Sequence, residues 1–157
     1  MEIFVTNDDG WGAKGILTIV RIMSELGHVT VVAPDGARSG MSNAITVAQP
    51  IYLRQLNDPS WGAEEWQKNV IVYTTNGTPS DCVKLAIDVV CEGDSSRIDL
   101  LISGINHGSN AGINVIYSGT MGACFVGAEH GIPSIGFSID DHSPEADFSH
   151  MEKYILE

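Results

Sequence analysis

A chain of 157 residues with 43% hydrophobic side chains can bury the core of one domain, so we expect residues 1–157 to form a single α/β domain. The net charge is −12 with only eight Lys and Arg residues, which excludes a nucleic acid polymer or an acidic membrane as the expected partner. Cys82, Cys91 and Cys124 form no CxxC pair and no leader or membrane-spanning stretch is evident, so we expect reduced thiols and a cytoplasmic protein.

The first informative stretch is Asn7-Asp8-Asp9-Gly10, between a predicted buried strand at 3–5 and a predicted helix at 16–23. In open α/β sheets, ligands bind at the carboxyl ends of the strands. Adjacent carboxylates repel each other, which raises the pKa of each unless a cation or several donors hold the charged form. A hard divalent ion with a preference for oxygen ligands removes that repulsion. The alternative for this tetrapeptide is an Asx turn that caps the next helix, with both carboxylates solvated.

A glycine pattern in the same segment also matches a dinucleotide-binding fingerprint. Gly10, Gly12 and Gly15 spell GxGxxG after a strand, and Asp35 follows the next predicted strand, 28–33, about 20 residues further on. However, the two carboxylates before the first glycine would point negative charge at a pyrophosphate. We therefore discount NAD binding and interpret the strand-helix-strand order as the start of a parallel sheet.

The loop at 35–43 follows the second strand and so lies at the same edge of the sheet as the acid pair. Ser39 can supply an oxygen ligand there, and Arg38 a forked donor for phosphate, although an ordinary turn is the simpler interpretation. Residues 44–53 then predict a strand pair or edge ribbon with a break at Pro50.

The rest of the chain alternates predicted strands and helices. Residues 57–69, which contain Trp61 and Trp66, are interpreted as a surface excursion. Thr78 or Ser80 can cap the predicted helix that contains residues 83–90. Residues 140–142, Asp-Asp-His, could mimic a metal cluster, but a solvated loop is the simpler interpretation. The elements are predicted as strands at 69–74, 98–102 and 134–139, helices at 83–90 and 118–128, and the start of a helix at 151–157.

The second informative stretch is the glycine-rich segment 103–122, which we expect to be a loop directly after a strand. Glycine lets backbone N–H groups approach a ligand closely, and such amides can bind an anion. Asn106 lies where its amide oxygen can join the carboxylates around a metal ion. The helix that starts at Ser118-Gly119-Thr120 offers an N-terminus suited to phosphate. His107 is the one histidine near this predicted site and could protonate a leaving alkoxide.

Four motifs of the chain occur in the order found in the survival protein SurE family. They are Asn7-Asp8-Asp9-Gly10, Ala33-Pro34-Asp35 with Arg38-Ser39-Gly40, Gly77 to Cys82, and Ser103-Gly104-Ile105-Asn106 with Tyr117-Ser118-Gly119-Thr120. The chain resembles this family over most of its length. The resemblance implies a Rossmann-like α/β fold of three layers with a mostly parallel sheet. It also implies hydrolysis of nucleoside 5′- and 3′-monophosphates with one divalent metal ion, Mg²⁺ or Mn²⁺, in a dimer or tetramer.

Carried over motif by motif, the resemblance also implies the site residues. The metal ligands would be Asp8, Asp9, Ser39 and Asn106, with Asp8 and Asp9 as the catalytic pair. The phosphate and substrate contacts would be Asn110, Ser118, Gly119 and Thr120. The chain departs from the family at Lys14, where Pro is usual, and at Val126, where Glu is usual. Family members also continue well beyond Glu157, so we expect a chain that lacks their C-terminal, subunit-exchanging arm.

Two classes of function stay open from the residues themselves. In a metal-dependent phosphatase, two carboxylates and two neutral oxygens hold the ion, and backbone amides cradle the phosphoryl oxygens. The general base is not assigned, because Asp8 or Asp9 could accept the proton of water as well as bind metal. The alternative is a nucleotide- or phosphate-sensing module of the receiver type, whose acid pair binds magnesium at a strand end without turnover.

Overall fold

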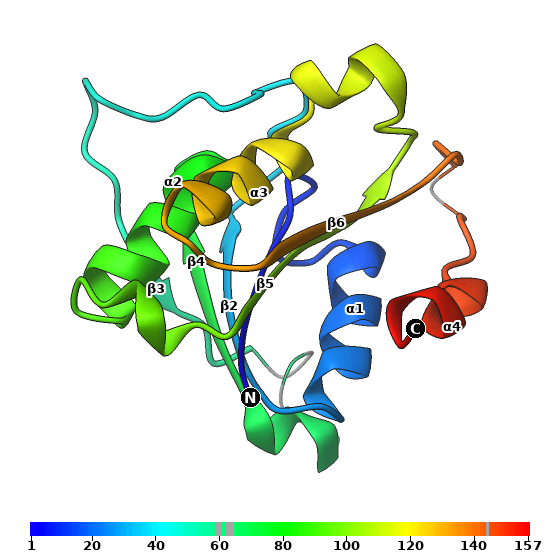
Figure 1. The fold of residues 1–157 in the computed structure, drawn as a ribbon, viewed down its shortest axis with the longest axis horizontal. Helices are drawn as coiled ribbons and strands as arrows, with labels where there is room; N and C mark the ends of the chain where they lie inside the picture. The colour runs from blue at the N-terminus through cyan, green and yellow to red at the C-terminus, as the bar shows by residue number, and fades with distance from the viewer. Residues whose placement is uncertain (59–60, 62–64, 144) are drawn as a thin grey trace.

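The computed structural model describes residues 1–58, 61, 65–143 and 145–157, and its centre is a six-stranded sheet in the order β3-β4-β2-β1-β5-β6 (Figure 1). Every neighbouring pair is parallel except β3 and β4. The expected α/β fold with a mostly parallel, Rossmann-like sheet is confirmed. The strands are β1 (Glu2–Thr6), β2 (His28–Pro34), β3 (Arg54–Gln55), β4 (Val70–Thr75), β5 (Leu100–His107) and β6 (Ser134–Ile139).

Helices cover both faces of the sheet and complete three layers (Figure 1). One face is covered by α1, with α4 beside it, and the other by α2 and α3. The α-helices are α1 (Lys14–Ser24), α2 (Pro79–Leu85), α3 (Gly119–Glu129) and α4 (Glu152–Ile155), and a π-helix, η3 (Ala86–Val90), continues α2. The short 3₁₀ helices are η2 (Glu65–Asn69), η4 (Ser95–Arg97), η5 (Gly112–Ile116) and η6 (Ser149–Met151).

Two buried cores form because successive side chains of a strand point to opposite faces of the sheet. Ile3 and Val5 of β1 join the core under α1, whereas Phe4 joins the core under α2 and α3. Burial of a side chain of this size contributes about 1.5–3 kcal/mol. All three cysteines are free and buried, as the sequence predicts.

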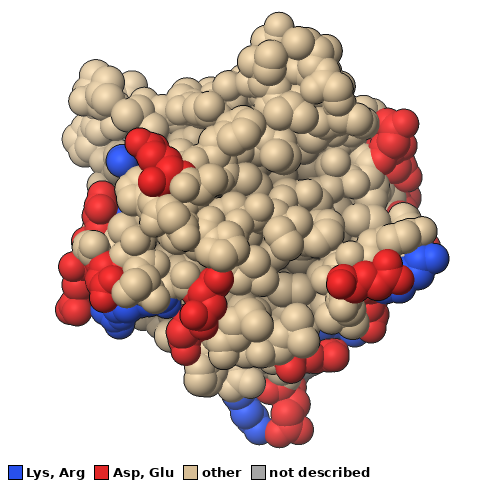
Figure 2. All heavy atoms as spheres, viewed as in Figure 1, with Lys and Arg blue, Asp and Glu red and all other residues tan. Residues whose placement is uncertain are grey.

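The surface shown in Figure 2 carries its charged side chains mainly at its periphery. Two half-exposed apolar side chains, Phe125 of α3 and Ile135 of the edge strand β6, belong to elements on the viewer's side of the sheet in Figure 1. On the face shown, the acidic side chains therefore leave most of the middle uncharged. Among the described residues, no helix has both the length and the apolar character needed to cross a membrane.

The prediction of a strand pair at 44–53 is wrong. The structure describes all of these residues and assigns them to no strand, and only Arg54–Gln55 pair with β4. Side-chain hydrogen bonds, rather than the backbone hydrogen bonds of a β-ladder, hold this segment. The backbone N–H of Tyr52, for example, donates to Asn76 Oδ1 at 3.0 Å, and Asn76 Nδ2 donates to the carbonyl of Pro50 at 3.1 Å.

The interpretation of 57–69 as a surface excursion is wrong for Trp61. Its side chain is only 6% exposed and belongs to the core under α1, and Trp66 packs partly buried against the same core. Pro59 and Gly62 of the same segment lie outside the described residues. Burial of the large apolar side chain of Trp61 therefore fixes its position in the core, although the neighbouring residues in the sequence are acidic.

β5 is longer than the sequence predicts. The strand runs to His107, so the loop expected to begin at residue 103 begins only after it. Gly104 has φ +125°, and a Cβ there would lie 2.3 Å from the carbonyl oxygen of Phe137 in β6. The register between β5 and β6 shifts between Ser103 and Asn106. Asn106 therefore lies inside the paired strand, one residue before its end, rather than past its end.

The start of α2 is capped as predicted, and the cap also holds the 44–53 segment. Thr78 Oγ1 accepts a hydrogen bond from the Asp81 backbone N–H at 3.1 Å, while Asp81 Oδ2 accepts one from the Thr78 N–H at 2.9 Å. The Asp81 carboxylate also accepts from the backbone N–H of Thr46 at 2.9 Å and from its hydroxyl at 2.6 Å.

We expect Asp81→Asn to lower the free energy of unfolding by about 1–2 kcal/mol at pH 7. Burial by itself raises the pKa of Asp81, but hydrogen bonds from Thr46 and Thr78 outweigh it and hold the pKa below its ordinary value. A carboxyl group whose folded-state pKa is lowered stabilises the protein above its unfolded-state pKa of about 4, and this contribution is lost as the pH falls through the folded-state pKa.

Urea unfolding of both proteins at pH 7 and at pH 3 measures this contribution. Asp88→Asn is the matched control, because it removes the same charge from an exposed position on η3. The stability difference between wild type and Asp81→Asn should shrink at pH 3. An equal difference at both pH values would show that the carboxylate charge is not the source of the stabilisation.

Candidate metal and phosphate site

The candidate site begins at the carboxyl end of β1, where the sheet order reverses. β1 is flanked by β2 on one side and by β5 on the other, and this switch point is where open α/β sheets bind ligands. The turn after β1 is held by Asn7, whose Nδ2 donates to the Gly10 carbonyl at 2.9 Å and whose Oδ1 accepts from the Gly10 N–H at 3.2 Å. Because Asn7 closes the turn, the carboxylates of Asp8 and Asp9 are free for other contacts.

Asp8 is buried, with 4% of its surface exposed. Thr120 Oγ1 donates a hydrogen bond to Asp8 Oδ1 at 2.9 Å, and the Arg38 backbone N–H donates to the Asp8 carbonyl at 2.6 Å. Burial raises the pKa of Asp8 to about 6, the hydrogen bond from Thr120 opposes that shift, and the neighbouring charge of Asp9 adds to it. A bound cation would stabilise the charged form that burial disfavours.

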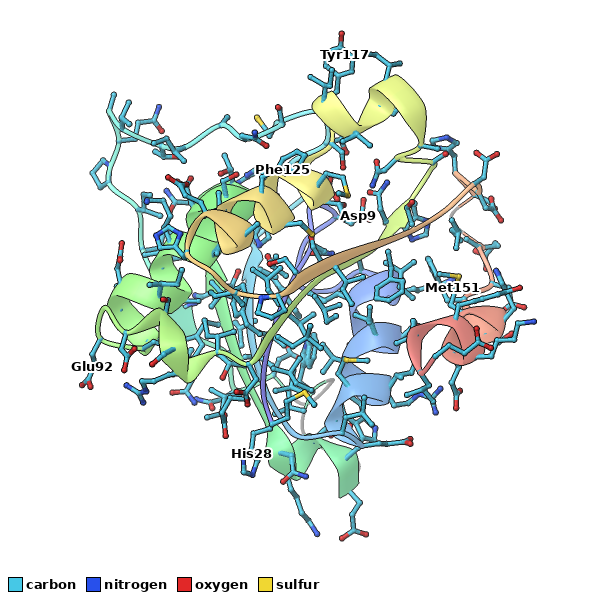
Figure 3. The ribbon with its side chains drawn as sticks, in the orientation of Figure 1. Asp9, His28, Glu92, Tyr117, Phe125 and Met151 are labelled. Atoms are coloured by element: carbon cyan, nitrogen blue, oxygen red, sulfur yellow. The ribbon has the colours of Figure 1, made fainter. Side chains whose placement is uncertain are left out.

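Asp9 is half-buried beside Asp8 at the carboxyl end of the sheet, the end opposite His28 in Figure 3. Its Oδ2 accepts one long hydrogen bond, from the backbone N–H of His107 at 3.4 Å. Burial raises the pKa of Asp9, and the hydrogen bond and charge of His107 lower it in part. Both members of the acid pair therefore resist ionisation in the absence of a cation.

A pocket of about 280 Å³ opens beside Asp8. Five of the eight residues predicted for the site line it, namely Asp8, Ser39, Asn106, Asn110 and Ser118. Asp9 lies next to Asp8 without lining the pocket. Gly119 and Thr120, which were predicted as substrate contacts, do not line it either, because both lie behind the carboxylate of Asp8. The structure thus gathers residues from three strand ends and from the start of α3.

The donor set of this pocket suits a hard divalent ion. Within the part of the chain that the structure describes, no three His, Cys, Asp or Glu side chains lie close enough together to hold a metal ion. An ion at Asp8 and Asp9 would therefore need neutral oxygens, and the pocket offers them on Ser39 and Asn106. Asn106 Nδ2 donates to the Gly108 carbonyl at 2.8 Å, which leaves its Oδ1 for a cation. Oxygen donors of this kind fit Mg²⁺ or Mn²⁺.

Asn110 carries the clearest sign of a missing anionic ligand. Its Nδ2 is buried and has no hydrogen-bond partner among the described residues. An unpaired buried donor costs about 1–3 kcal/mol, so it persists where a ligand can satisfy it. The backbone N–H of Asn110 donates to Ser138 Oγ at 3.4 Å, which helps to hold the residue in the pocket wall. A phosphate oxygen is an acceptor that would pair this donor.

Sequence reasoning missed several residues of the pocket wall. Asn114, Tyr117 and His142 line it, although residues 140–142 were interpreted as a solvated loop. The His142 ring packs on Gly108, where a Cβ would lie 2.2 Å from His142 Cε1. His142 follows the end of β6, so the rule that pointed to the ends of β1 and β5 would have found it. His107 lines the pocket too, as expected, with its ring edge-on to Phe148 at 4.9 Å between centroids.

An acid pair, neutral oxygens and an unpaired amide donor meet at the switch point of a parallel sheet, so the chain is an α/β protein with a candidate cation and phosphate site of Rossmann-like placement. A family model described as survival protein SurE matches residues 3–157, and the chain belongs to this family.

Individual relatives agree with this assignment. The chain is 46% identical over 153 residues to the 5′-nucleotidase SurE of Cytophaga hutchinsonii, covering 98% of this chain and 55% of the relative. It is 48% identical over 154 residues to the 5′-nucleotidase SurE of Christiangramia forsetii, with the same coverages. The crystal structure of the SurE protein from Aquifex aeolicus matches with a TM-score of 0.82 and 33% identity over 99% of this chain and 57% of that one. The chain thus spans about half the length of its relatives.

Proposed function

We propose that this chain carries the active site of a metal-dependent nucleotidase that hydrolyses nucleoside 5′- and 3′-monophosphates to a nucleoside and phosphate. The observation that supports the proposal most strongly is the pocket that joins Asp8, Ser39 and Asn106 to the unpaired Nδ2 of Asn110. The names of the relatives, 5′-nucleotidase SurE, support the 5′ activity. The acceptor and donor groups of the pocket suit a cation and a phosphoryl group side by side.

In this proposal the acid pair and the neutral oxygens hold one divalent ion, Mg²⁺ or Mn²⁺. When bound, such an ion supplies positive charge that stabilises the phosphoryl group and activates water. Asn110 donates from Nδ2 to a phosphoryl oxygen, and Ser118 lies beside it in the wall. These groups need little reorganisation as charge develops, because the Asn110 N–H donates to the hydroxyl of Ser138 in β6 and Ser118 Oγ accepts from the Met121 N–H of α3.

The exposed rim of the pocket suits the nucleoside part of the substrate. Tyr117 is 61% exposed and projects at the carboxyl end of the sheet in Figure 3, where it lines the pocket together with Asn114. An aromatic face can stack on any base, which suits a pocket that accepts several nucleotides. The small volume of the pocket matches a phosphate and sugar more closely than a polymer.

We expect the folded chain to release inorganic phosphate from nucleoside 5′- and 3′-monophosphates with Mg²⁺ or Mn²⁺ present, and to lose about 100-fold or more of that rate with a chelator. Phosphate release from a panel of both sugar positions measures the activity and ranks the substrates. A radiolabelled phosphoryl donor tests the receiver alternative in parallel, because a stable phospho-aspartate without free phosphate would favour a sensing module. No release from protein that circular dichroism shows to be folded would overturn the proposal for this chain.

A further inference from the structure

The hydroxyl of Thr120 points at Asp8 rather than into the pocket. Thr120 is fully buried, with 0% of its surface exposed, and its Oγ1 donates to Asp8 Oδ1 at 2.9 Å. It does not line the pocket, so a ligand there would meet the carboxylate of Asp8 and not this hydroxyl. The side chain of Thr120 therefore affects a ligand in the pocket through Asp8.

Gly119 brings the start of α3 against the same carboxylate. A Cβ at Gly119 would lie 2.9 Å from Asp8 Cβ and 3.1 Å from Asp8 Oδ2, with Pro79 of α2 at 3.1 Å on the other side. Any larger residue at position 119 would displace Asp8. The absence of a side chain thus allows Asp8 to occupy the space between the first turns of two helices.

The first turn of α3 lies against the carboxylate of Asp8. The Met121 N–H donates to Ser118 Oγ at 3.1 Å, which closes the cap, and Thr120 stabilises the charged form of Asp8 through both its hydroxyl and its backbone. A helix N-terminus attracts negative charge, because its N–H groups and dipole point outward. The sequence suggested phosphate at this helix end, whereas the structure places Asp8 there.

Burial alone does not give a hydroxyl of this chain a partner. Thr74, Ser80 and Ser103 are also buried, and their hydroxyls have no partner among the described residues, whereas Ser118 Oγ accepts from the Met121 N–H. The bond from Thr120 to Asp8 is therefore a specific contact.

We propose that Thr120 is a positioning residue for the metal ion: its hydroxyl holds Oδ1 of Asp8 so that Oδ2 is left in a fixed direction for the cation, and Gly119 makes room for this arrangement. The inference rests on the metal site of the proposed function. It assigns the Thr side chain to the carboxylate and leaves phosphate to Asn110 and Ser118. Groups that orient a metal ligand in this way typically change metal affinity by about 10- to 100-fold when they are removed.

The test is calorimetric titration of the metal-free protein with Mn²⁺, without substrate. Thr120→Val keeps the shape of the side chain and removes its hydroxyl, and should weaken Mn²⁺ binding by about tenfold or more. Thr120→Ser keeps the hydroxyl and should bind Mn²⁺ within about threefold of wild type. Thr74→Val is the matched control, because it replaces a buried Thr whose hydroxyl has no partner among the described residues, and it should leave the affinity unchanged.

Each result decides the role of Thr120. Unchanged Mn²⁺ affinity in Thr120→Val would overturn the proposal, and weaker binding of inorganic phosphate to the Mn²⁺-loaded variant would then assign the residue to phosphate. If Thr120→Val does not fold, Thr120→Ser and Thr120→Ala give the same comparison, because they differ by the hydroxyl alone. A wild-type protein that binds Mn²⁺ but releases no phosphate would overturn the nucleotidase proposal only, since the Mn²⁺ affinities would still decide this one.

Discussion

Asp9→Asn is expected to reduce metal-supported phosphate release by at least about 10³-fold while the fold stays intact. The substitution keeps the shape of the side chain and removes one of the two negative charges that the cation requires. Within the described part of the chain, Asp9 accepts one long hydrogen bond, from the His107 N–H at 3.4 Å, so few structural contacts are lost. Steady-state kcat/KM for a nucleoside 5′-monophosphate with Mn²⁺ measures the effect.

The stability of the metal-free variant separates a loss of chemistry from a loss of fold. Burial raises the pKa of Asp9, which means that its charge is held at a cost in the folded protein. A neutral Asn removes that cost, so the melting temperature of metal-free Asp9→Asn should equal or exceed that of wild type. Asp140→Asn is the matched control, because Asp140 is an exposed aspartate that follows β6 at the same edge of the sheet. Undiminished turnover in folded Asp9→Asn would exclude Asp9 from the cation site.

Gly15→Ala is expected to lower the free energy of unfolding by about 3 kcal/mol or more. A Cβ at Gly15 would lie 2.0 Å from the carbonyl oxygen of Ile105, and this contact is between backbone segments of α1 and β5. Rotation of a side chain cannot relieve it, so α1 would have to move away from the sheet and open the core that contains Ile16 and Ile19. Equilibrium unfolding in urea measures the loss.

Gly12→Ala is the natural control for this prediction. Gly12 belongs to the same glycine pattern, but a Cβ there would meet no atom within 4 Å, and its φ is not positive. Its substitution should therefore change the stability by less than about 0.5 kcal/mol. Equal effects of the two substitutions would mean that α1 does not pack against Ile105 as the structure shows.

Gly15 also gives the GxGxxG pattern a structural reason that does not require a dinucleotide. The third glycine of the fingerprint serves the close packing of a helix on the sheet, and this purpose is independent of the ligand. Here the structural reason for the glycine holds, because a Cβ at Gly15 would lie 2.0 Å from the carbonyl oxygen of Ile105. The negative charges, and not the glycine spacing, distinguished the two interpretations in the sequence.

The parallel sheet could be predicted because its central strands are largely buried on both faces. Residues 3–5 are continuously apolar, residues 28–33 are mostly apolar, and a helical pattern lies between them, which is the signature of a strand-helix-strand unit. Asp8, Ser39 and Asn106 could be placed together for the same reason. Each lies at the carboxyl end of a parallel strand, and those ends meet at one edge.

The features that the sequence did not reveal depend on contacts between distant segments. Residues 44–53 have strand-like composition, but Asp81 and Asn76 bind their backbone and side chains in an irregular conformation. Trp61 has acidic neighbours in the sequence and an apolar core in the structure. Local propensity carries no information about such partners. The hydroxyl of Thr120 is a further case, because nothing in Ser118-Gly119-Thr120 shows that a carboxylate lies opposite.

The bond between Thr120 and Asp8 joins residues that are 112 positions apart in the chain. Contacts of this separation require a long loop to close, and they form slowly for that reason. Asp8 and Asp9 precede β5 and α3 in the chain, so their surroundings are complete only after β5 has entered the sheet and α3 has docked beside it. A ribosome that has released β1, α1 and β2 but not yet β5 and α3 therefore holds the acid pair without the other residues of the candidate site.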